Sequence, residues 1–161
     1  MLPGAGGRVH ITGIKGTGCA ALAEILCARG VAVTGSDIGD VFYTDALLAR
    51  LGITPKLFAP ENITADTGLV IYSAAYNPGE HPELCAAQKL GIPCISYPEA
   101  LGLVSAECFS VGIAGVHGKT TTAALAGILA QALDLPAQVL AGSAVPAFGQ
   151  GTGKCVMSNG N

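Results

Sequence analysis

The sequence is poor in charged and aromatic side chains. Only 12% of its 161 residues are charged, 5% are aromatic, and tryptophan is absent. The net charge of −3 comes without a basic run, so neither a basic nucleic-acid surface nor an aromatic base-stacking platform is predicted. Half of the residues are apolar, which excludes an intrinsically disordered chain.

Neither a membrane span nor a signal peptide is predicted from the sequence. The longest apolar stretch, Thr120 to Leu133, contains three threonines and a glutamine and is shorter than the roughly 18 residues that a spanning helix needs. The N-terminus has neither a charged start nor an apolar core. We therefore expect a cytoplasmic protein whose six scattered cysteines, none in a CxxC pair, are free thiols rather than zinc ligands.

The first two thirds of the sequence alternate between strand and helix patterns. Strands are expected over residues 8–13, 31–35, 53–58, 69–73 and 93–96, and helices over residues 18–29, 43–51, 81–90 and 98–104. This alternation is typical of βαβ units with a parallel sheet. We expect residues 1–105 to form one Rossmann-like, doubly wound α/β domain.

Residues 106–161 start the same pattern again. A strand is expected over 109–114, a loop over 115–119, a helix over 120–133 and a strand over 138–141. These few elements are too small to build a core of their own. The simplest explanation is the truncated start of a second α/β domain of the P-loop type, in the front part of a longer protein.

The second unit contains the clearest motif. Glycines between an expected strand and helix let backbone N–H groups surround a phosphate at the positive end of the helix. The predicted nucleotide-binding residues are Gly115, Val116, His117, Gly118, Lys119, Thr120 and Thr121. Lys119 would contact the β- and γ-phosphates, and the Thr120 hydroxyl would bind Mg²⁺. Ile113 stands where GxxxxGK[ST] has its first glycine, and the alternative is an ordinary helix-opening turn with an exposed lysine.

A second glycine-rich loop follows the first expected strand. Its candidate binding residues are Gly13, Lys15, Gly16, Thr17 and Gly18. These glycines permit a tight turn beside a helix N-terminus, and Asp37, 24 residues after Gly13, stands where a ribose-binding acid is expected. The pattern departs from GxGxxG at Lys15. The alternatives are a turn that serves only packing and an NAD-binding domain of the oxidoreductase type.

Ser73 follows the expected buried strand 69–73. Ligands of open α/β sheets bind beyond the carboxyl ends of the strands, so Ser73 could contact a phosphate or a sugar. It could equally cap the next turn. No Ser-His-Asp triad or paired carboxylates are visible, and His10 and His81 are interpreted as a strand and a helix-entry residue.

Together these motifs resemble the Mur ligase family, in the family's order and over nearly the whole chain. The matching segments are Gly13–Cys19, Ala23–Leu26, Gly35–Asp37, Ser73–Tyr76, His81–Leu84, Leu90–Cys94 and Gly115–Thr122. The sequence is most similar to members that join L-alanine to UDP-N-acetylmuramic acid in peptidoglycan synthesis.

The resemblance implies a three-domain, ATP-dependent ligase. The first domain would hold the UDP-sugar through the loop Gly13–Gly18 and through Ser36, Asp37 and Ser73. The second would bind ATP and Mg²⁺, with Lys119 as the catalytic lysine and Thr120 as a metal ligand. ATP would phosphorylate the muramyl carboxylate, and the amine of L-alanine, docked by the third domain, would attack the acyl phosphate. This chain alone is expected to be inactive.

Three departures leave alternatives open. Lys15 replaces a glycine of the family, Cys19 a methionine and Val116 a threonine. Lys15 either adds a positive charge near the pyrophosphate or blocks its close approach. A related recycling ligase, which joins UDP-muramic acid to an intact tripeptide, and a non-catalytic nucleotide-binding module also fit the motifs. The sequence does not identify the oligomeric state.

Overall fold

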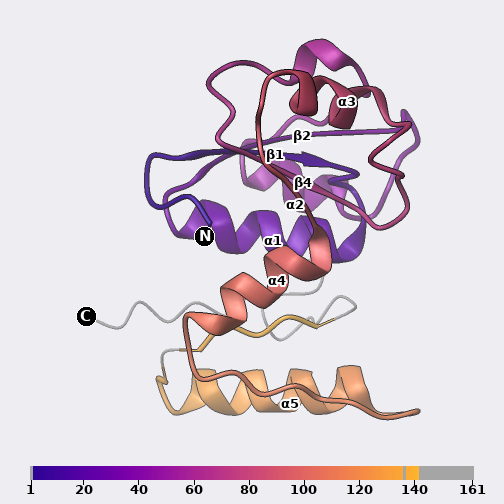
Figure 1. Cartoon of the computed structure of the whole chain (residues 1–161). Helices are drawn as coiled ribbons and strands as arrows, with labels where there is room; N and C mark the ends of the chain where they lie inside the picture. The colour runs from indigo at the N-terminus through magenta and orange to yellow at the C-terminus, as the bar shows by residue number, and fades with distance from the viewer. Residues whose placement is uncertain (1, 136, 142–161) are drawn as a thin grey trace.

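The computed structural model of the protein describes residues 2–135 and 137–141 (Figure 1). Its five strands form one parallel sheet in the order β3-β2-β1-β4-β5. The strands are β1 (Arg8–Thr12), β2 (Ala32–Asp37), β3 (Lys56–Leu57), β4 (Leu69–Tyr72) and β5 (Cys94–Ser96). The order reverses direction between β1 and β4, and such a switch point is where open α/β sheets bind ligands.

Helices cover both faces of the sheet, which confirms the expected doubly wound α/β class. They are α1 (Thr17–Ala28), α2 (Asp45–Arg50), α3 (Pro82–Lys89), α4 (Tyr97–Ala106) and α5 (Lys119–Ala132), with a short 3₁₀ helix η1 (Pro60–Asn62). In Figure 1, α3 lies on one side of the sheet and α1 and α4 lie on the other, with α5 farther out on that second side. No helix of the described ranges is both long and apolar enough to cross a membrane.

The pleat of the two central strands divides the core. Val9, Ile11 and Ile71 belong to the larger apolar cluster, which includes α1 and α4, while Val70 belongs to a smaller cluster with Leu84 of α3. Successive strand residues point to opposite faces. His10 and Thr12, which alternate with Val9 and Ile11, are nevertheless buried, at 1% and 0% exposure. The α3 face of β1 is therefore buried and polar.

Helix α4 begins as predicted, next to a proline in its first turn. The Ser96 hydroxyl accepts a hydrogen bond from the backbone N–H of Glu99 (3.5 Å), and the Glu99 carboxylate accepts one from the backbone N–H of Ser96 (2.7 Å). This capping box satisfies donors that the first turn of a helix leaves free. Helix α4 ends at Ala106, beside the boundary expected at residue 105.

Two expected strands are wrong. Residues 109–114 and 138–141 form no strand, and Phe109 and Val111 are 95% and 74% exposed. A strand is stable only when a neighbour pairs with its backbone, and the described part of the chain supplies no such neighbour after β5. Helix α5 does form, because its hydrogen bonds are local, yet Gly127 is its only buried residue.

The cysteines of the described residues are free thiols, as expected. They are Cys19, Cys27, Cys85, Cys94 and Cys108. Cys155, together with the other residues from 142 to 161 that were assigned to the second unit, lies outside the described residues.

Candidate functional site

The first glycine loop is anchored to the end of β2. The backbone N–H groups of Gly13 and Ile14 donate to the carbonyl of Ser36 (2.9 and 3.1 Å), and the N–H of Lys15 donates to Asp37 Oδ2 (2.7 Å). Gly13 has a φ of +83°, a conformation that costs a side-chain-bearing residue energy. The loop therefore turns sharply from β1 into α1, with its shape set by β2.

The same loop touches the end of β4. A Cβ atom added to Gly13 would lie 2.8 Å from Ser73 Cβ and 2.7 Å from Tyr76 Cε2, so only glycine fits there. The N–H of Ser73 donates to the carbonyl of Thr12 (3.0 Å). The structure thus brings Gly13 and Ser73 together at the switch point between β1 and β4. The sequence analysis expected both residues at the carboxyl ends of parallel strands, where ligands bind.

The N-terminus of α1 opens at this switch point. Its N-cap is Gly16, which is exposed and offers no side-chain cap, and its first turn contains no acidic residue. Thr17 forms a hydroxyl–hydroxyl hydrogen bond with Tyr43, and Gly18 lies against the ring of Tyr97, whose Cζ is 2.6 Å from the position of an added Cβ. Free N–H groups at a helix N-terminus attract anions, so this arrangement suits a phosphate.

Ser36 and Asp37 are buried and act on the loop. Ser36 is 0% exposed and Asp37 is 4% exposed. The two carboxylate oxygens of Asp37 accept hydrogen bonds from the backbone N–H groups of Lys15 and Ile38 (2.7 and 2.8 Å). The structure therefore gives both residues a part in shaping the glycine loop, while their direct contact with a ligand stays a prediction.

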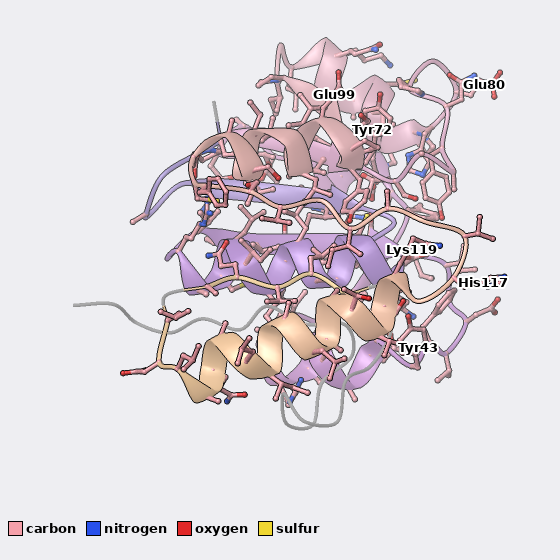
Figure 2. The ribbon with its side chains drawn as sticks, turned by 90° about the horizontal axis from the view of Figure 1, so that it is seen from below. Tyr43, Tyr72, Glu80, Glu99, His117 and Lys119 are labelled. Carbon is pink, nitrogen blue, oxygen red and sulfur yellow. The ribbon has the colours of Figure 1, made fainter. Side chains whose placement is uncertain are left out.

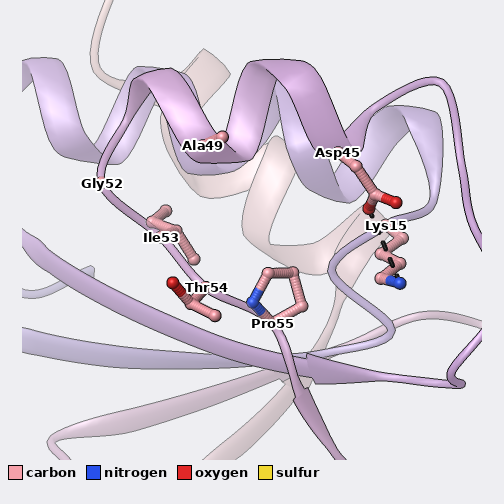
Figure 3. Close-up of a pocket in the computed structure, with 7 residues that line it drawn as sticks. All are labelled: Lys15, Asp45, Ala49, Gly52, Ile53, Thr54 and Pro55. Carbon is pink, nitrogen blue, oxygen red and sulfur yellow. Dashed lines mark ion pairs between the residues drawn. The ribbon is translucent and has the colours of Figure 1, made fainter.

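The Lys15 side chain leads away from the glycine loop towards α2 (Figure 3). Its Nζ donates to the carbonyl of Asp40 (2.7 Å), lies 3.6 Å from Asp45 Oδ1 and 5.7 Å from the ring centre of Phe42. A pocket of about 360 Å³ opens here; its other lining residues are Ala49, Gly52, Ile53, Thr54 and Pro55. The Lys15 ammonium thus lies beside the Asp45 carboxylate at α2 and not beside Ser73.

Ser73 caps its own turn. It is half-buried, and its Oγ accepts a long hydrogen bond from the N–H of Ala75 (3.4 Å). Capping of the next turn is the alternative that the sequence left open for Ser73. Ser73 lies beside Gly13 at the β1/β4 switch point, and its contact with a ligand there stays a prediction.

The second loop presents a lysine at the start of α5. The N-cap of α5 is Gly118, with a φ of +77°, and no side-chain cap or first-turn acid precedes its exposed N–H groups. Lys119 Nζ donates to the carbonyls of Gly115 (2.6 Å) and Val116 (3.2 Å). In Figure 2, Lys119 and His117 lie towards the same end of the molecule as Tyr43.

This loop fits the phosphates of a nucleotide. A 14-residue helix with an uncapped N-terminus and a cation in its first residue matches a polyanion in both field and hydrogen-bond donors. Thr120 and Thr121 are exposed beside it. The described residues contain no group of three His, Cys, Asp or Glu side chains that could hold a metal ion. Thr120 stays the Mg²⁺ ligand predicted from the sequence.

The sequence analysis missed a buried carboxylate. Glu83 of α3 is 0% exposed and accepts hydrogen bonds from Thr12, Ser36 and Asn62. A signal for it existed, because polar residues alternate with apolar ones in β1 and also in β2, where Thr34 and Ser36 flank Gly35. Polar side chains on one buried face require a polar partner.

The sequence analysis also missed that His81 belongs to a group of packed rings next to Gly13. Its ring centre lies 4.6 Å from that of Phe58 and 5.0 Å from that of Tyr76. Both ring nitrogens are buried and have no hydrogen-bond partner among the described residues. Burial lowers the pKa of His81 against the opposing effect of Glu83. At neutral pH His81 is therefore an uncharged ring that supports Tyr76 beside Gly13.

Comparison with known proteins agrees with this geometry. The family model described as "Mur ligase family, catalytic domain" matches residues 8–107. The chain belongs to the Mur ligase family. This confirms the resemblance that the motifs suggested.

Relatives of this Mur ligase chain are named as L-alanine ligases. The chain is 52% identical over 155 residues to UDP-N-acetylmuramate–L-alanine ligase of Treponema pallidum, covering 96% of this chain and 32% of that protein. It is 40% identical over 156 residues to the ligase of the same name from Borreliella burgdorferi, covering 94% and 33%. The chain therefore spans about a third of the length of these curated relatives.

Solved structures share its fold. The crystal structure of UDP-N-acetylmuramate–alanine ligase from Thermotoga maritima matches with a TM-score of 0.81 at 27% identity, over 95% of this chain and 35% of that one. A UDP-N-acetylmuramate:L-alanyl-γ-D-glutamyl-meso-diaminopimelate ligase from Neisseria meningitidis also matches with a TM-score of 0.81, at 26% identity, over 96% and 48%.

Proposed function

We propose that this chain forms the UDP-sugar-binding part, and the start of the ATP-binding part, of a cytoplasmic ligase that joins L-alanine to UDP-N-acetylmuramic acid in peptidoglycan synthesis. The observation that carries the proposal is the meeting of the Gly13 loop with Ser73 at the β1/β4 switch point, in a chain 52% identical to a ligase of that name. Residues 1–105 would bind the sugar nucleotide, and residues 106–161 would begin the ATP-binding domain.

The proposed sugar-nucleotide site uses backbone more than side chains. The N–H groups at the start of α1 would bind the pyrophosphate, with the hydroxyls of Thr17 and Ser73 at its sides. Ser36 and Asp37 would maintain the shape of the loop by accepting its backbone N–H groups. A site built from backbone N–H groups tolerates Lys15 in place of the family's glycine, because the Lys15 side chain leaves towards Asp40.

The proposed ATP site uses Lys119 and the start of α5. ATP with Mg²⁺ would supply the phosphoryl group that activates the muramyl carboxylate towards the amine of L-alanine. Lys119 would exchange its loop carbonyls for phosphate oxygens and offset their charge, and the Thr120 hydroxyl would bind Mg²⁺. Residues 115–118 would surround the phosphates with N–H groups.

A second candidate is the tripeptide-joining ligase. The Neisseria meningitidis structure matches with the same TM-score as the Thermotoga maritima one, so the fold does not favour either reaction. The 52% identity favours L-alanine as the amine. An assay of the full-length protein with L-alanine and with the tripeptide separates the two.

The first test is calorimetric titration of this chain with UDP-N-acetylmuramic acid, UDP-N-acetylglucosamine and NAD. We expect saturable binding of UDP-N-acetylmuramic acid and none of NAD. The Ser73→Ala variant should bind more weakly, and Ser105→Ala, on α4 away from the glycine loop, should bind like the unchanged chain. Binding of NAD alone, or no UDP-sugar binding, would contradict a sugar-nucleotide site within residues 1–105.

A further inference from the structure

A buried polar cluster lies between the sheet and α3. We call it the Glu83 cluster; its members are His10, Thr12, Ser36, Asn62 and Glu83. Thr12 Oγ1 and Ser36 Oγ donate to Glu83 Oε2 (2.7 and 2.5 Å), and Asn62 Nδ2 donates to Oε1 (2.7 Å). The N–H of Ala59 also donates to Oε1 (3.3 Å), and His10 Nε2 lies 3.5 Å from Oε2.

Glu83 is a charged group without exposure to water. Burial alone raises the pKa of Glu83, but the four polar side chains around the carboxylate outweigh burial and lower that pKa to about 2. Glu83 is therefore a carboxylate at neutral pH. Among the described residues the only basic side chain within 4 Å of Glu83 is His10, and hydroxyl and amide donors compensate for the lost hydration of the carboxylate.

The hydrogen bonds of the cluster have a defined direction. The Ser36 hydroxyl donates to Glu83, so it accepts from His10 Nε2–H at 3.2 Å. His10 Nδ1 lies 2.9 Å from Thr34 Oγ1. Glu83 thereby orders a chain of polar groups that crosses from α3 through β2 to β1.

Two of the three strand residues of the cluster, Thr12 and Ser36, adjoin the glycine loop. Thr12 is the residue before Gly13, and its carbonyl receives the N–H of Ser73. Ser36 receives the N–H groups of Gly13 and Ile14 through its carbonyl. The Glu83 carboxylate therefore hydrogen-bonds to Thr12 and Ser36. The backbone carbonyls of these two residues in turn accept the N–H groups of Ser73 and of the glycine loop.

We propose that Glu83 is a positioning residue, which acts through Thr12 and Ser36 to hold the Gly13–Gly18 loop in the shape that receives the pyrophosphate of the sugar nucleotide. It touches no ligand itself. The ligand part of this inference rests on the proposed function, whereas the effect on the loop does not. A purely structural role would instead stabilise α3, β1 and β4 alike.

The test of the loop effect is amide hydrogen exchange on this chain. Glu83→Gln keeps the size of the side chain but replaces one acceptor oxygen by an NH₂ group. This NH₂ group would face hydroxyl or amide donors and could not accept their hydrogen bonds. We expect the amides of Gly13, Ile14 and Lys15 to exchange about tenfold faster, which corresponds to about 1.4 kcal/mol of local opening free energy, while β4 amides stay protected. The matched control is Glu80→Gln, an exposed glutamate three residues earlier, which should change neither.

A second variant keeps the test valid if Glu83→Gln fails to fold. Thr12→Val preserves shape and removes one donor to Glu83, so the same three amides should exchange faster by a smaller factor. Exchange that is unchanged in the loop, or faster throughout the sheet, would overturn the positioning role.

Ligand titration completes the design. Glu83→Gln should weaken UDP-N-acetylmuramic acid binding about tenfold, with Glu80→Gln unchanged. A looser loop with unaltered affinity would overturn the proposal that the loop's shape serves the ligand. If the unchanged chain binds no UDP-sugar, the proposed function fails, and the exchange rates still decide whether Glu83 positions the loop.

Discussion

Gly35 leaves room for the one apolar side chain of the glycine loop. A Cβ atom on Gly35 would lie 2.7 Å from Ile14 Cβ and 2.9 Å from the carbonyl oxygen of Ile11. Ile14 is 0% exposed and belongs to the main core. The loop is therefore anchored by packing against β2 as well as by hydrogen bonds.

Gly35→Ala should destabilise the fold and the site together. Because backbone and a packed side chain surround the new methyl group, we expect a loss of about 1–3 kcal/mol in unfolding free energy, measured by urea denaturation. UDP-sugar affinity should fall as well. The control is Gly102→Ala, because Gly102 is exposed within α4 and an added Cβ would have no atom within 4 Å. This variant should raise the free energy of unfolding by up to about 1 kcal/mol. Equal stability of Gly35→Ala and the unchanged chain would refute this account.

The Glu83 carboxylate predicts a pH dependence of stability. Its pKa falls from an ordinary 4.5 to about 2 on folding, so its stabilisation is complete above pH 4.5 and is lost as the pH falls towards 2. Between those limits the unchanged chain should lose up to about 3 kcal/mol more than Glu83→Gln. Urea denaturation at a series of pH values measures this difference, and parallel curves for the two proteins would contradict it.

Secondary elements differ in how much they need neighbours. Helix α5 forms from local hydrogen bonds although its Leu125 and Leu129 are both about 60% exposed. The apolar segment 109–114, which has the composition of a buried strand, stays unpaired, because strand hydrogen bonds come only from another strand. Periodicity therefore predicted α5 but could not predict whether a strand finds its partner.

At the scale of the whole molecule, the two glycine loops lie in different parts of the chain, the first between β1 and α1 and the second before α5. The Gly13 loop is anchored to β2 and β4, whereas the Lys119 ammonium, among the described residues, donates hydrogen bonds to carbonyls of its own loop. Arg29 at the end of α1 joins the units by hydrogen bonds to Glu107 (2.5 Å) and Gln138 (3.2 Å). Arg29 lies at the opposite end of α1 from the Gly13 loop, and within the described residues neither glycine loop donates a hydrogen bond to the other. We therefore expect the two proposed ligands to bind independently.

Lys119→Ala tests this independence. We expect the variant to lose ATP binding and to keep UDP-N-acetylmuramic acid affinity within about twofold, as for a surface substitution away from a site. Calorimetric titration of each ligand, alone and with the other present, measures both effects. A parallel loss of UDP-sugar affinity would show that the two loops form one site.

The sequence by itself determined the alternating α/β pattern, the doubly wound class and the two glycine loops, because each depends on residues close together in the chain. It also carried the family resemblance that the comparisons confirmed. Only the tertiary structure decided that Asp37 and Ser36 face the loop, that Lys15 turns to Asp40 and Asp45, and that Glu83 lies beneath Thr12. These contacts join residues 22 to 71 positions apart, and only the pairing of β1 with β2 and β4 brings them together.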